Sequence, residues 1–346
     1  MRIAVDLLGG DHAPDVVVDG ALLALDADPS LVPVLVGPID IAADALAARD
    51  ARDRVEVVAA SQVIEMAEHP ARAVRAKRDA TVRVAARLVH EGGADAMVSV
   101  GSTGATMAAA LFTFGRVTGV TRPPLAIVVA AAAHPVVLLD VGSTVEAGPG
   151  LLAQFALAGA AYARVRLGLE EPRVGLLSVG SEDVKGDDTR KAAYDAIDAA
   201  LGELPARFVG NVEGSDVPLG GPADVVVTDG LTGNVLLKGL EGMLTRIAHG
   251  LTAVAGDDPV VHRAFRKATA ALDADTVGGA ILLGVDGVAV VGHGASNAGA
   301  VASCIHAAAQ AVTDGVVPNV TAALADLVAR RRLAAGPPVM PASVTT

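Results

Sequence analysis

Short runs of apolar residues alternate with longer amphipathic stretches along most of the chain. The apolar runs are continuous rather than alternating, which is typical of parallel strands buried on both faces. They fall at residues 3–5, 32–36, 55–58, 96–100, 136–141, 174–179, 223–228 and 288–291. Stretches with helical periodicity lie between them, at 81–90, 151–167, 189–201 and 297–312. This alternation predicts an α/β fold with a mainly parallel sheet covered by helices on both faces.

A glycine-rich polar turn follows nearly every predicted strand. In an open parallel sheet, ligands bind outside the carboxyl ends of the strands. Glycine allows close backbone approach, and the helix N-termini behind such turns direct N–H groups toward an anion. We therefore expect the turns to form one polar rim along one edge of the sheet. They lie at 9–12, 101–104, 142–144, 180–183, 210–214, 229–234 and 292–296.

The domain organisation follows from length and from the absence of a linker. The chain has 346 residues, enough for one large domain or two of medium size. No linker divides it, so we expect a single domain over residues 1–335. A charge-rich segment at about 243–276 is predicted to be a helical excursion from the sheet. Residues 336–346 are rich in proline, serine and threonine and are predicted to be a flexible tail.

Composition narrows the function classes and the compartment. The net charge of −12 and the 2% aromatic content argue against nucleic-acid binding. A single cysteine, Cys304, excludes an internal disulfide and a multi-cysteine metal site. The mean hydropathy is +0.50, but the longest apolar run, at 125–133, is far shorter than the ~20 residues of a membrane span. The first residues lead straight into a strand without a signal-peptide pattern, so we expect a cytoplasmic protein.

Several well-known catalytic motifs are absent. The sequence has no G-x-G-x-x-G after the first strand, no phosphate-binding P-loop and no H-E-x-x-H metal motif. It also has no G-x-S-x-G nucleophile elbow. Cys304 lies within a predicted helix and is interpreted as a core residue. These absences disfavour a nicotinamide-dependent dehydrogenase and a serine hydrolase.

The turns, taken together and in order, resemble one family, the bacterial phosphate acyltransferases of phospholipid synthesis. The resemblance runs from residue 1 to about residue 311. It is carried by D-L-L-G-G-D-H-A-P at 6–14, H-P-A-R-A-V-R at 69–75, G-S-T-G-A at 101–105, L-D-V-G at 139–142, G-S-E-D-V-K-G at 180–186, G-N-V-E-G at 210–214, D-G-L-T-G-N-V at 229–235, G-G-A at 278–280 and H-G-A-S at 293–296.

The resemblance implies a three-layer α/β/α domain related to phosphotransacetylases and isocitrate-dehydrogenase-like enzymes. It implies a homodimer that moves a fatty acyl group from acyl carrier protein to inorganic phosphate, with no cofactor. The acyl phosphate would then feed a membrane glycerol-3-phosphate acyltransferase. The chain departs from the family pattern at Ser102, usually asparagine, at residues 130–135 and 142–146, and at Val277, where an aromatic residue is common.

Catalytic roles are assigned to residues in the matching turns. Lys185 is predicted to contact phosphate, and His12 or His293 to handle the proton of the leaving sulfur. Asn234 and Thr232 are expected to orient the acyl carbonyl, and Asp229 or Asp140 to orient a neighbouring group. Backbone N–H groups at 101–104 and 230–233 are expected to cradle phosphate or the oxyanion. The remaining substrate-binding candidates are Gly10, Asp11, Gly101, Ser102, Thr103, Gly104, Glu182 and Gly233.

Asp6 is interpreted as structural, and no metal is predicted, although Asp11, His12 and Asp229 were weighed as ligands. Acyl carrier protein is acidic, and this chain is acidic overall. It therefore needs a local basic patch to bind the carrier protein. The candidates are Arg75 with Arg78, and Arg263 with Arg266. The segment at 243–271 is expected to touch the membrane surface only weakly.

Two alternatives stay open. One is a phosphotransacetylase that uses acyl-coenzyme A, and the other is a non-catalytic module that binds carrier protein. Turnover with each type of thioester distinguishes them.

Overall fold

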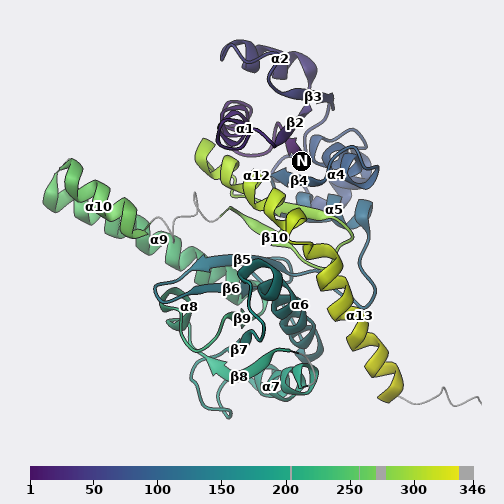
Figure 1. Ribbon diagram of the computed structural model, residues 1–346, viewed down its shortest axis with the longest axis vertical. Coiled ribbons are helices and arrows are strands. Elements are labelled where there is room, and N and C mark those ends of the chain that lie inside the picture. Colours follow the sequence, from purple (N-terminus) through teal and green to yellow (C-terminus); the bar gives the residue numbers. More distant parts are fainter. Residues whose placement is uncertain (203–204, 257, 270–277, 335–346) are drawn as a thin grey trace, which may run out of the picture.

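A computed structural model describes residues 1–202, 205–256, 258–269 and 278–334 (Figure 1). In this part of the chain the strands form one sheet in the order β3-β2-β1-β4-β11-β10-β5-β6-β9-β7-β8. The strands are β1 (Arg2–Asp6), β2 (Val32–Gly37), β3 (Glu56–Ala59), β4 (Ala96–Ser99), β5 (Leu125–Ala130), β6 (Pro135–Leu139), β7 (Arg173–Leu177), β8 (Arg207–Val212), β9 (Val225–Val227), β10 (Ala280–Leu282) and β11 (Val288–Val291).

Helices cover both faces of this sheet, which confirms the predicted three-layer fold. They are α1 (Asp15–Ala27), α2 (Ile39–Ala47), α3 (Pro70–Ala76), α4 (Thr81–His90), α5 (Thr103–Phe114), α6 (Pro149–Leu167), α7 (Asp188–Leu201), α8 (Asp216–Leu219), α9 (Gly230–Ala255), α10 (Pro259–Thr269), α12 (Ala298–Thr313) and α13 (Val316–Ala334). One core cluster joins the sheet to α1, α2, α6, α7, α12 and α13, and the other joins it to α3, α4, α5, α8 and the first half of α9.

Strand direction reverses in the middle of the sheet. Strands β3, β2, β1, β4 and β11 are mutually parallel, and so are β6, β9, β7 and β8. The antiparallel pairs β11–β10, β10–β5 and β5–β6 join these two blocks, so the blocks run in opposite directions. The expectation that all the turns share one edge of a parallel sheet is therefore wrong.

Sheet twist brings part of the two blocks back together. Neighbouring strands rotate by roughly 20–25° each, so the five steps from β4 to β9 rotate the strand axis by roughly 100–125°. Two opposed strands then have carboxyl ends that point into the same cleft instead of to opposite sides. The residues that line the main cavity, described below, come from both blocks.

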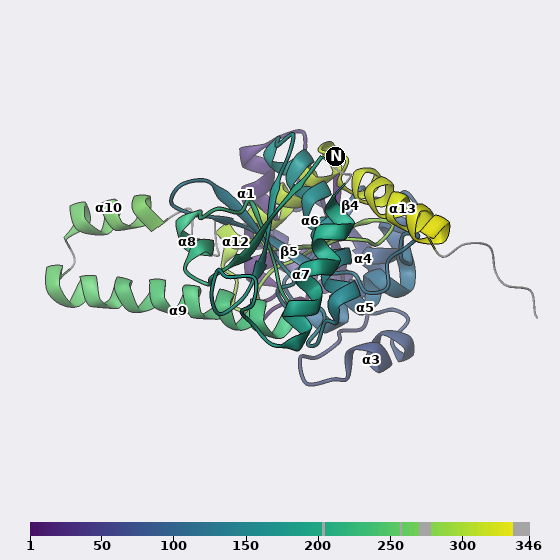
Figure 2. The ribbon, with the colours of Figure 1, turned by 90° about the horizontal axis from the view of Figure 1, so that it is seen from below.

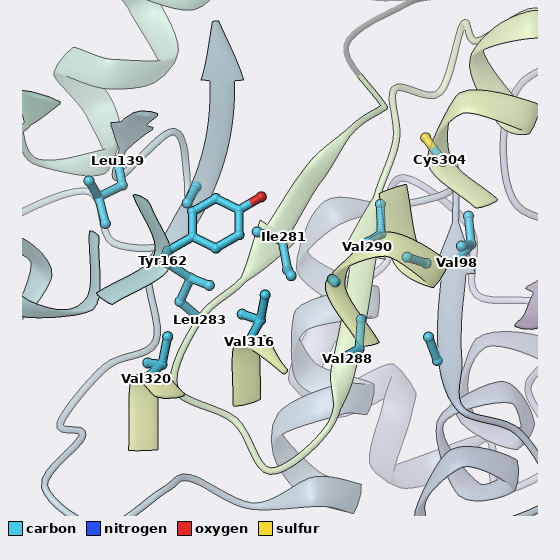
Figure 3. Packing of buried hydrophobic residues seen from close by; sticks show 14 of the residues in the cluster. Val98, Leu139, Tyr162, Ile281, Leu283, Val288, Val290, Cys304, Val316 and Val320 are labelled. Carbon is cyan, nitrogen blue, oxygen red and sulfur yellow. The ribbon is translucent and has the colours of Figure 1, made fainter. Parts of the chain in front are cut away.

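The hydrophobic core is continuous across the reversal. Figure 3 shows Tyr162 of α6 and Val316 of α13 beside Ile281 of β10, close to residues of β11 and β4. These side chains are at most 8% exposed. Cys304 is also buried, as expected for a core residue. The joining strands are thus packed as tightly as either block.

Helix α9 leaves the body of the molecule. Its first half packs on the sheet, while its second half and α10 form an arm that extends away from the other elements (Figures 1 and 2). Large apolar side chains are exposed on the arm, among them Met243 (59%), Val254 (89%) and Val260 (70%). Helix α9 is 26 residues long, so the arm continues the helix that begins at Gly230.

The predicted strands and helices are present at nearly the expected positions, but three strands, β5, β8 and β10, were not predicted, nor were several helices, among them α1, α2, α5 and α13. Strand β5 lies in the apolar run that the sequence analysis weighed only as a membrane span, and β10 has three residues. Strand β8 includes Gly210 and Asn211, which were expected in a turn. Residues 230–234 belong to α9. Val277 and residues 336–346 lie outside the described residues.

No single described helix is long and apolar enough to cross a membrane. Helix α12 and the following residues up to Ala325 pass the test of length and composition only as a pair bent by 56°. Helix α12 packs in the core through residues that include Val301 and Ile305.

Candidate functional site

A large apolar cavity lies where α9 crosses the sheet. Its volume is about 770 Å³, and its walls come from β5, α9, α10 and α12. The apolar lining includes Leu125, Ile127, Leu240, Leu244 and Phe265. The cavity thus runs beneath α9 toward the arm, and its walls are apolar on several sides. It falls within the size range of small-molecule sites.

Polar groups from both strand blocks border the same cavity. Thr103 stands at the first turn of α5, Asn234 in the first turn of α9, and His293 follows β11. The Asn234 Nδ2 donates to the Val141 carbonyl at 3.2 Å. The Ala295 N–H donates to His293 Nδ1 at 3.2 Å, so the proton of a neutral ring lies on Nε2, which is left to donate. The cavity is therefore apolar along its length and rich in donors at one end.

The loop after β6 is held by one buried carboxylate. Asp140 is 0% exposed and accepts five hydrogen bonds, from the N–H groups of Leu125, Gly142, Ser143 and Thr144 and from the Ser143 hydroxyl. Burial raises the pKa of Asp140, and these hydrogen bonds oppose the rise. The bonds come from the loop and from Leu125 at the start of β5, so Asp140 fixes the wall of the cavity and both its oxygens are occupied.

The start of α9 abuts this loop closely. A Cβ on Gly233 would lie 2.0 Å from the Asp140 carbonyl oxygen, and one on Gly230 would lie 2.7 Å from the Thr144 carbonyl oxygen. Glycine is required at both positions because any side chain would overlap the backbone of the loop. Close packing here sets the position of Asn234 one residue further along the helix.

Asp229 caps α9 and is paired with an arginine that the sequence analysis missed. Its carboxylate accepts from the Thr232 N–H at 2.8 Å and from Arg190 Nη2 at 2.7 Å. Burial acts to raise the pKa of Asp229, but the hydrogen bonds from Thr232 and Arg190 outweigh it and lower the pKa. Asp229 is therefore held ionised as a helix cap. Arg190 lies on a helix after a polar loop, and no local signal in the sequence marks it.

Lys185 lies on the loop after β7, near the start of α9 but outside the apolar cavity. Its side chain is exposed, and its aliphatic part covers Gly180. The Asn211 amide donates to the Glu182 carbonyl at 2.7 Å and fixes this loop to β8. Arg190 joins α7, just after the loop, to Asp229 and Thr232. The loop that carries Lys185 and Glu182 is thus anchored beside the first turn of α9.

A second, smaller cavity of about 270 Å³ lies at the ends of β1 and β4. Gly10, Asp11, Gly101 and Ser102, all predicted substrate-binding residues, line it together with Asp6. Asp6 is 4% exposed, and its Oδ2 accepts from Ser99 Oγ at 2.7 Å while its Oδ1 has no hydrogen-bond partner. Burial raises the pKa of Asp6 against the opposing effect of the Thr81 and Ser99 hydroxyls. The predicted rim is therefore divided between two cavities of different character.

The other predicted residues line neither of these cavities. His12 is exposed after β1, and Gly104 packs against Pro70 at the start of α3. Arg75 lies over the ring of Phe112 at 4.7 Å, on a surface formed by α3 and α5, with Arg78 exposed nearby in sequence. Arg263 is exposed on α10, and the side chain of Arg266 lies outside the described residues. The two arginine pairs therefore belong to separate surfaces.

Groups suited to a metal are not found in the described ranges: no three His, Cys, Asp or Glu side chains there are arranged to hold an ion.

Lys238, on α9, lines the apolar cavity and pairs with Glu241 at 2.6 Å. The sequence analysis missed both residues, although their spacing of three on a helix is a recognisable pairing signal.

The fold defined by this sheet is that of phosphotransacetylases. The chain is similar to a phosphotransacetylase of Streptococcus pyogenes, with a TM-score of 0.60 at 19% identity over 90% of this chain and 94% of the other. It is similar to the EutD phosphotransacetylase of Staphylococcus aureus, with a TM-score of 0.59 at 17% identity over the same shares. Identities this low establish the architecture alone.

Sequence comparison identifies the family within that class. A model described as "Fatty acid synthesis protein" matches residues 1–319. Relatives called phosphate acyltransferase include a protein of Desulfitobacterium hafniense, 40% identical over 92% of this chain and 96% of its own length, and one of Heliobacterium modesticaldum, 43% identical over the same shares. The chain belongs to this fatty acid synthesis family.

Proposed function

We propose that the chain transfers a fatty acyl group from acyl carrier protein to inorganic phosphate and so supplies acyl phosphate for phospholipid synthesis. The observation that carries the proposal is the apolar cavity whose one polar end is bordered by the first turns of α5 and α9. A long acyl chain fits the apolar walls, and the reacting thioester fits the polar end. The names of the curated relatives support transfer to phosphate.

Burial of the acyl chain supplies the binding energy. Each methylene removed from water contributes about 0.8 kcal/mol, so the walls of the cavity favour long chains over short ones. Leu240, Leu244 and Phe265 lie on the helices of the arm side of the cavity. These residues are therefore the ones expected to sense chain length.

The reaction needs no covalent intermediate on the enzyme. An oxygen of hydrogen phosphate attacks the thioester carbonyl carbon, the carbon–sulfur bond breaks, and the leaving thiolate takes up the proton that the phosphate loses. N–H groups at the N-terminus of α5 and His293 Nε2 stabilise the oxygen that becomes negative. Lys185 holds the phosphate, because an ammonium group attracts an anion. The N–H groups expected to do so at the start of α9 are already bonded, Gly230 to the Thr144 carbonyl and Thr232 to Asp229. Positioning of two reactants in this way supplies most of the acceleration.

The acyl donor sets the partner surface. Acyl carrier protein is acidic, and Arg75 and Arg78 on the α3–α5 surface offer exposed positive charge next to the aromatic ring of Phe112. Helix α3 begins against Gly104 at the start of α5, so this surface leads to the polar end of the apolar cavity. Charge reversal at Arg75 and Arg78 is expected to raise the KM for carrier protein at low salt. Reversal at Arg263 and Arg266 tests the second surface in the same assay.

The arm carries the proposals on assembly and location. We propose a cytoplasmic homodimer, with the arm of α9 and α10 free to meet another surface. Its exposed Met243, Val254 and Val260 suit a second copy of the chain, the membrane surface or a membrane glycerol-3-phosphate acyltransferase. Sedimentation of the purified chain, with and without anionic vesicles, tests these contacts.

The deciding experiment measures phosphate-dependent release of free thiol from long-chain acyl carrier protein. Lys185→Ala is expected to lower the rate and raise the KM for phosphate, whereas Lys191→Ala, on the exposed side of α7, leaves both unchanged. Turnover with acyl-coenzyme A but not with carrier protein would establish the phosphotransacetylase alternative. Binding of carrier protein without turnover would establish the non-catalytic one.

A further inference from the structure

The small cavity at the ends of β1 and β4 contains a buried acceptor without a donor. Asp6 Oδ1 has no hydrogen-bond partner although its residue is 4% exposed. Ser99 holds the other oxygen, so the carboxyl group cannot turn to satisfy both atoms without breaking that bond. A buried acceptor left unpaired destabilises the site, and a ligand with an N–H or O–H group would remove that cost.

The polarity of the lining selects the kind of ligand. Asp6, Asp11 and Glu65 contribute carboxyl groups, and no Lys, Arg or His is among the described residues that line the cavity. An anion is therefore disfavoured. The first turns of α4 and α5, at Thr81 and Ser102, add hydroxyl groups and helix N-terminal N–H donors. An uncharged group that both donates and accepts, such as an amide, matches this lining.

The two cavities lie on either side of the start of α5. Ser102 lines the polar cavity, and the next residue, Thr103, lines the apolar one. A hydrogen bond of 2.8 Å from the Asp11 N–H to the Gly294 carbonyl joins the turn after β1 to the turn that carries His293. An acyl thioester has the same layout, with an apolar chain on one side of the sulfur and a polar arm on the other.

We propose that the small cavity binds an amide of the thiol arm that carries the acyl group, with Asp6 Oδ1 accepting the amide N–H. The inference rests on the proposed function, because it takes the acyl thioester as substrate. It places the thioester itself at the first turn of α5, between the two cavities. Carrier protein and coenzyme A present the same amide-bearing arm, so Asp6 serves recognition of the arm and not the choice between them.

The test compares two small donors that differ by one N–H group. One is a long-chain S-acyl thioester of N-acetylcysteamine, and the other is the matching thioester of 2-mercaptoethyl acetate, in which an ester replaces the amide. The wild-type chain is expected to prefer the amide donor by about tenfold in kcat/KM, since the ester leaves the buried Asp6 Oδ1 without a hydrogen bond. Asp6→Ala is expected to remove the preference and leave the KM for phosphate unchanged.

Asp6→Asn guards against a folding defect. It is nearly isosteric, its amide oxygen still accepts a hydrogen bond, and it is expected to retain a preference of two- to threefold; both variants are checked by thermal unfolding. The inference is overturned if Asp6→Ala keeps the full preference, if the KM for phosphate rises instead, or if the wild-type chain turns over acyl carrier protein but neither small donor. A wild-type chain inactive on every thioester refutes the proposed function itself.

Discussion

Two buried aspartates end strands on opposite blocks of the sheet, and their surroundings differ. Asp140 follows β6 and accepts five hydrogen bonds, four from the loop that it organises and one from Leu125 of β5. Asp6 ends β1 and accepts one from Ser99, with Oδ1 unpaired beside a cavity. Burial raises the pKa of both. The number of bonds already made, more than burial or pKa, separates an aspartate that builds the scaffold from one that is available to a ligand.

The largest expected loss of stability comes from disturbing the packing around Asp140. Gly233→Ala places a Cβ 2.0 Å from the Asp140 carbonyl oxygen, so we expect a loss of about 3 kcal/mol or more in the free energy of unfolding. Urea denaturation measures it. Gly239→Ala is the control in the same helix: a Cβ there meets nothing within 4 Å, and alanine should stabilise by up to about 1 kcal/mol. Equal effects would show that the close approach is relieved elsewhere.

Removal of the charge at each aspartate is expected to have the next largest effect. Asp140→Asn replaces one acceptor oxygen with an NH2 donor that faces N–H groups, so we expect a loss of about 2–4 kcal/mol. Asp6→Asn changes an oxygen without a partner, so its loss should stay within about 1 kcal/mol. The unfolding free energies of both variants, measured in urea, check the contrast. Similar losses would contradict the distinction between scaffold and site.

The dependence of stability on pH should distinguish Asp6 from Asp229, because their pKa values are shifted in opposite directions. The pKa of Asp6 is raised in the folded chain, so the folded state keeps its proton longer and stability falls as pH rises above about 4. The stability of Asp6→Asn relative to the wild type should therefore rise with pH over this range. The pKa of Asp229 is lowered, so its contribution is present above about 4 and is lost as the pH falls. Thermal melts between pH 3 and pH 8 give the Tm of each variant minus that of the wild type. This difference should rise with pH for Asp6→Asn and fall with pH for Asp229→Asn.

The smallest expected effects come from the serines beside each aspartate. The Ser143 hydroxyl bonds both Asp140 and the Pro123 carbonyl, whereas the Ser99 hydroxyl donates to Asp6 and accepts from the Gly101 N–H. Ser143→Ala should cost about 1–2 kcal/mol because the Asp140 loop depends on it. Ser99→Ala should cost about 1 kcal/mol and also lower the preference for the amide donor, which Ser143→Ala leaves intact. Donor kinetics alongside urea unfolding separate the two outcomes.

Much of the fold could be predicted because local patterns encode it. Continuous apolar runs gave β1, β2, β4 and β11 within a residue or two. Strand direction could not be predicted, because it depends on which strands pair, and β10 and β5 pair across more than 150 residues of sequence. Strand β8 was missed since Gly210 and Asn211 resemble a turn, yet they lie in a strand at the edge of the sheet.

The site was predictable as a set of glycine-rich turns but not as an arrangement. The sequence indicated Thr103, Asn234 and His293, and all three border one cavity. It gave no sign that Gly10 and Ser102 border a different one. Arg190 was missed because its partner, Asp229, is 39 residues away in the chain. Asp140, followed by Val-Gly-Ser-Thr, does carry a local signal, since short polar residues soon after an aspartate favour loops closed on its carboxylate.

Helix α9 also has a mechanical meaning. At 1.5 Å per residue its 26 residues span about 39 Å, from the glycines wedged against the Asp140 loop to the exposed arm. One end is clamped, the middle is a wall of the apolar cavity, and the far end is free of the body of the molecule. The helix is therefore fixed at the end near the reacting groups and is free to pivot about that end. A contact that moves the arm would therefore also move the wall of the apolar cavity that α9 forms, and with it the space open to an acyl chain.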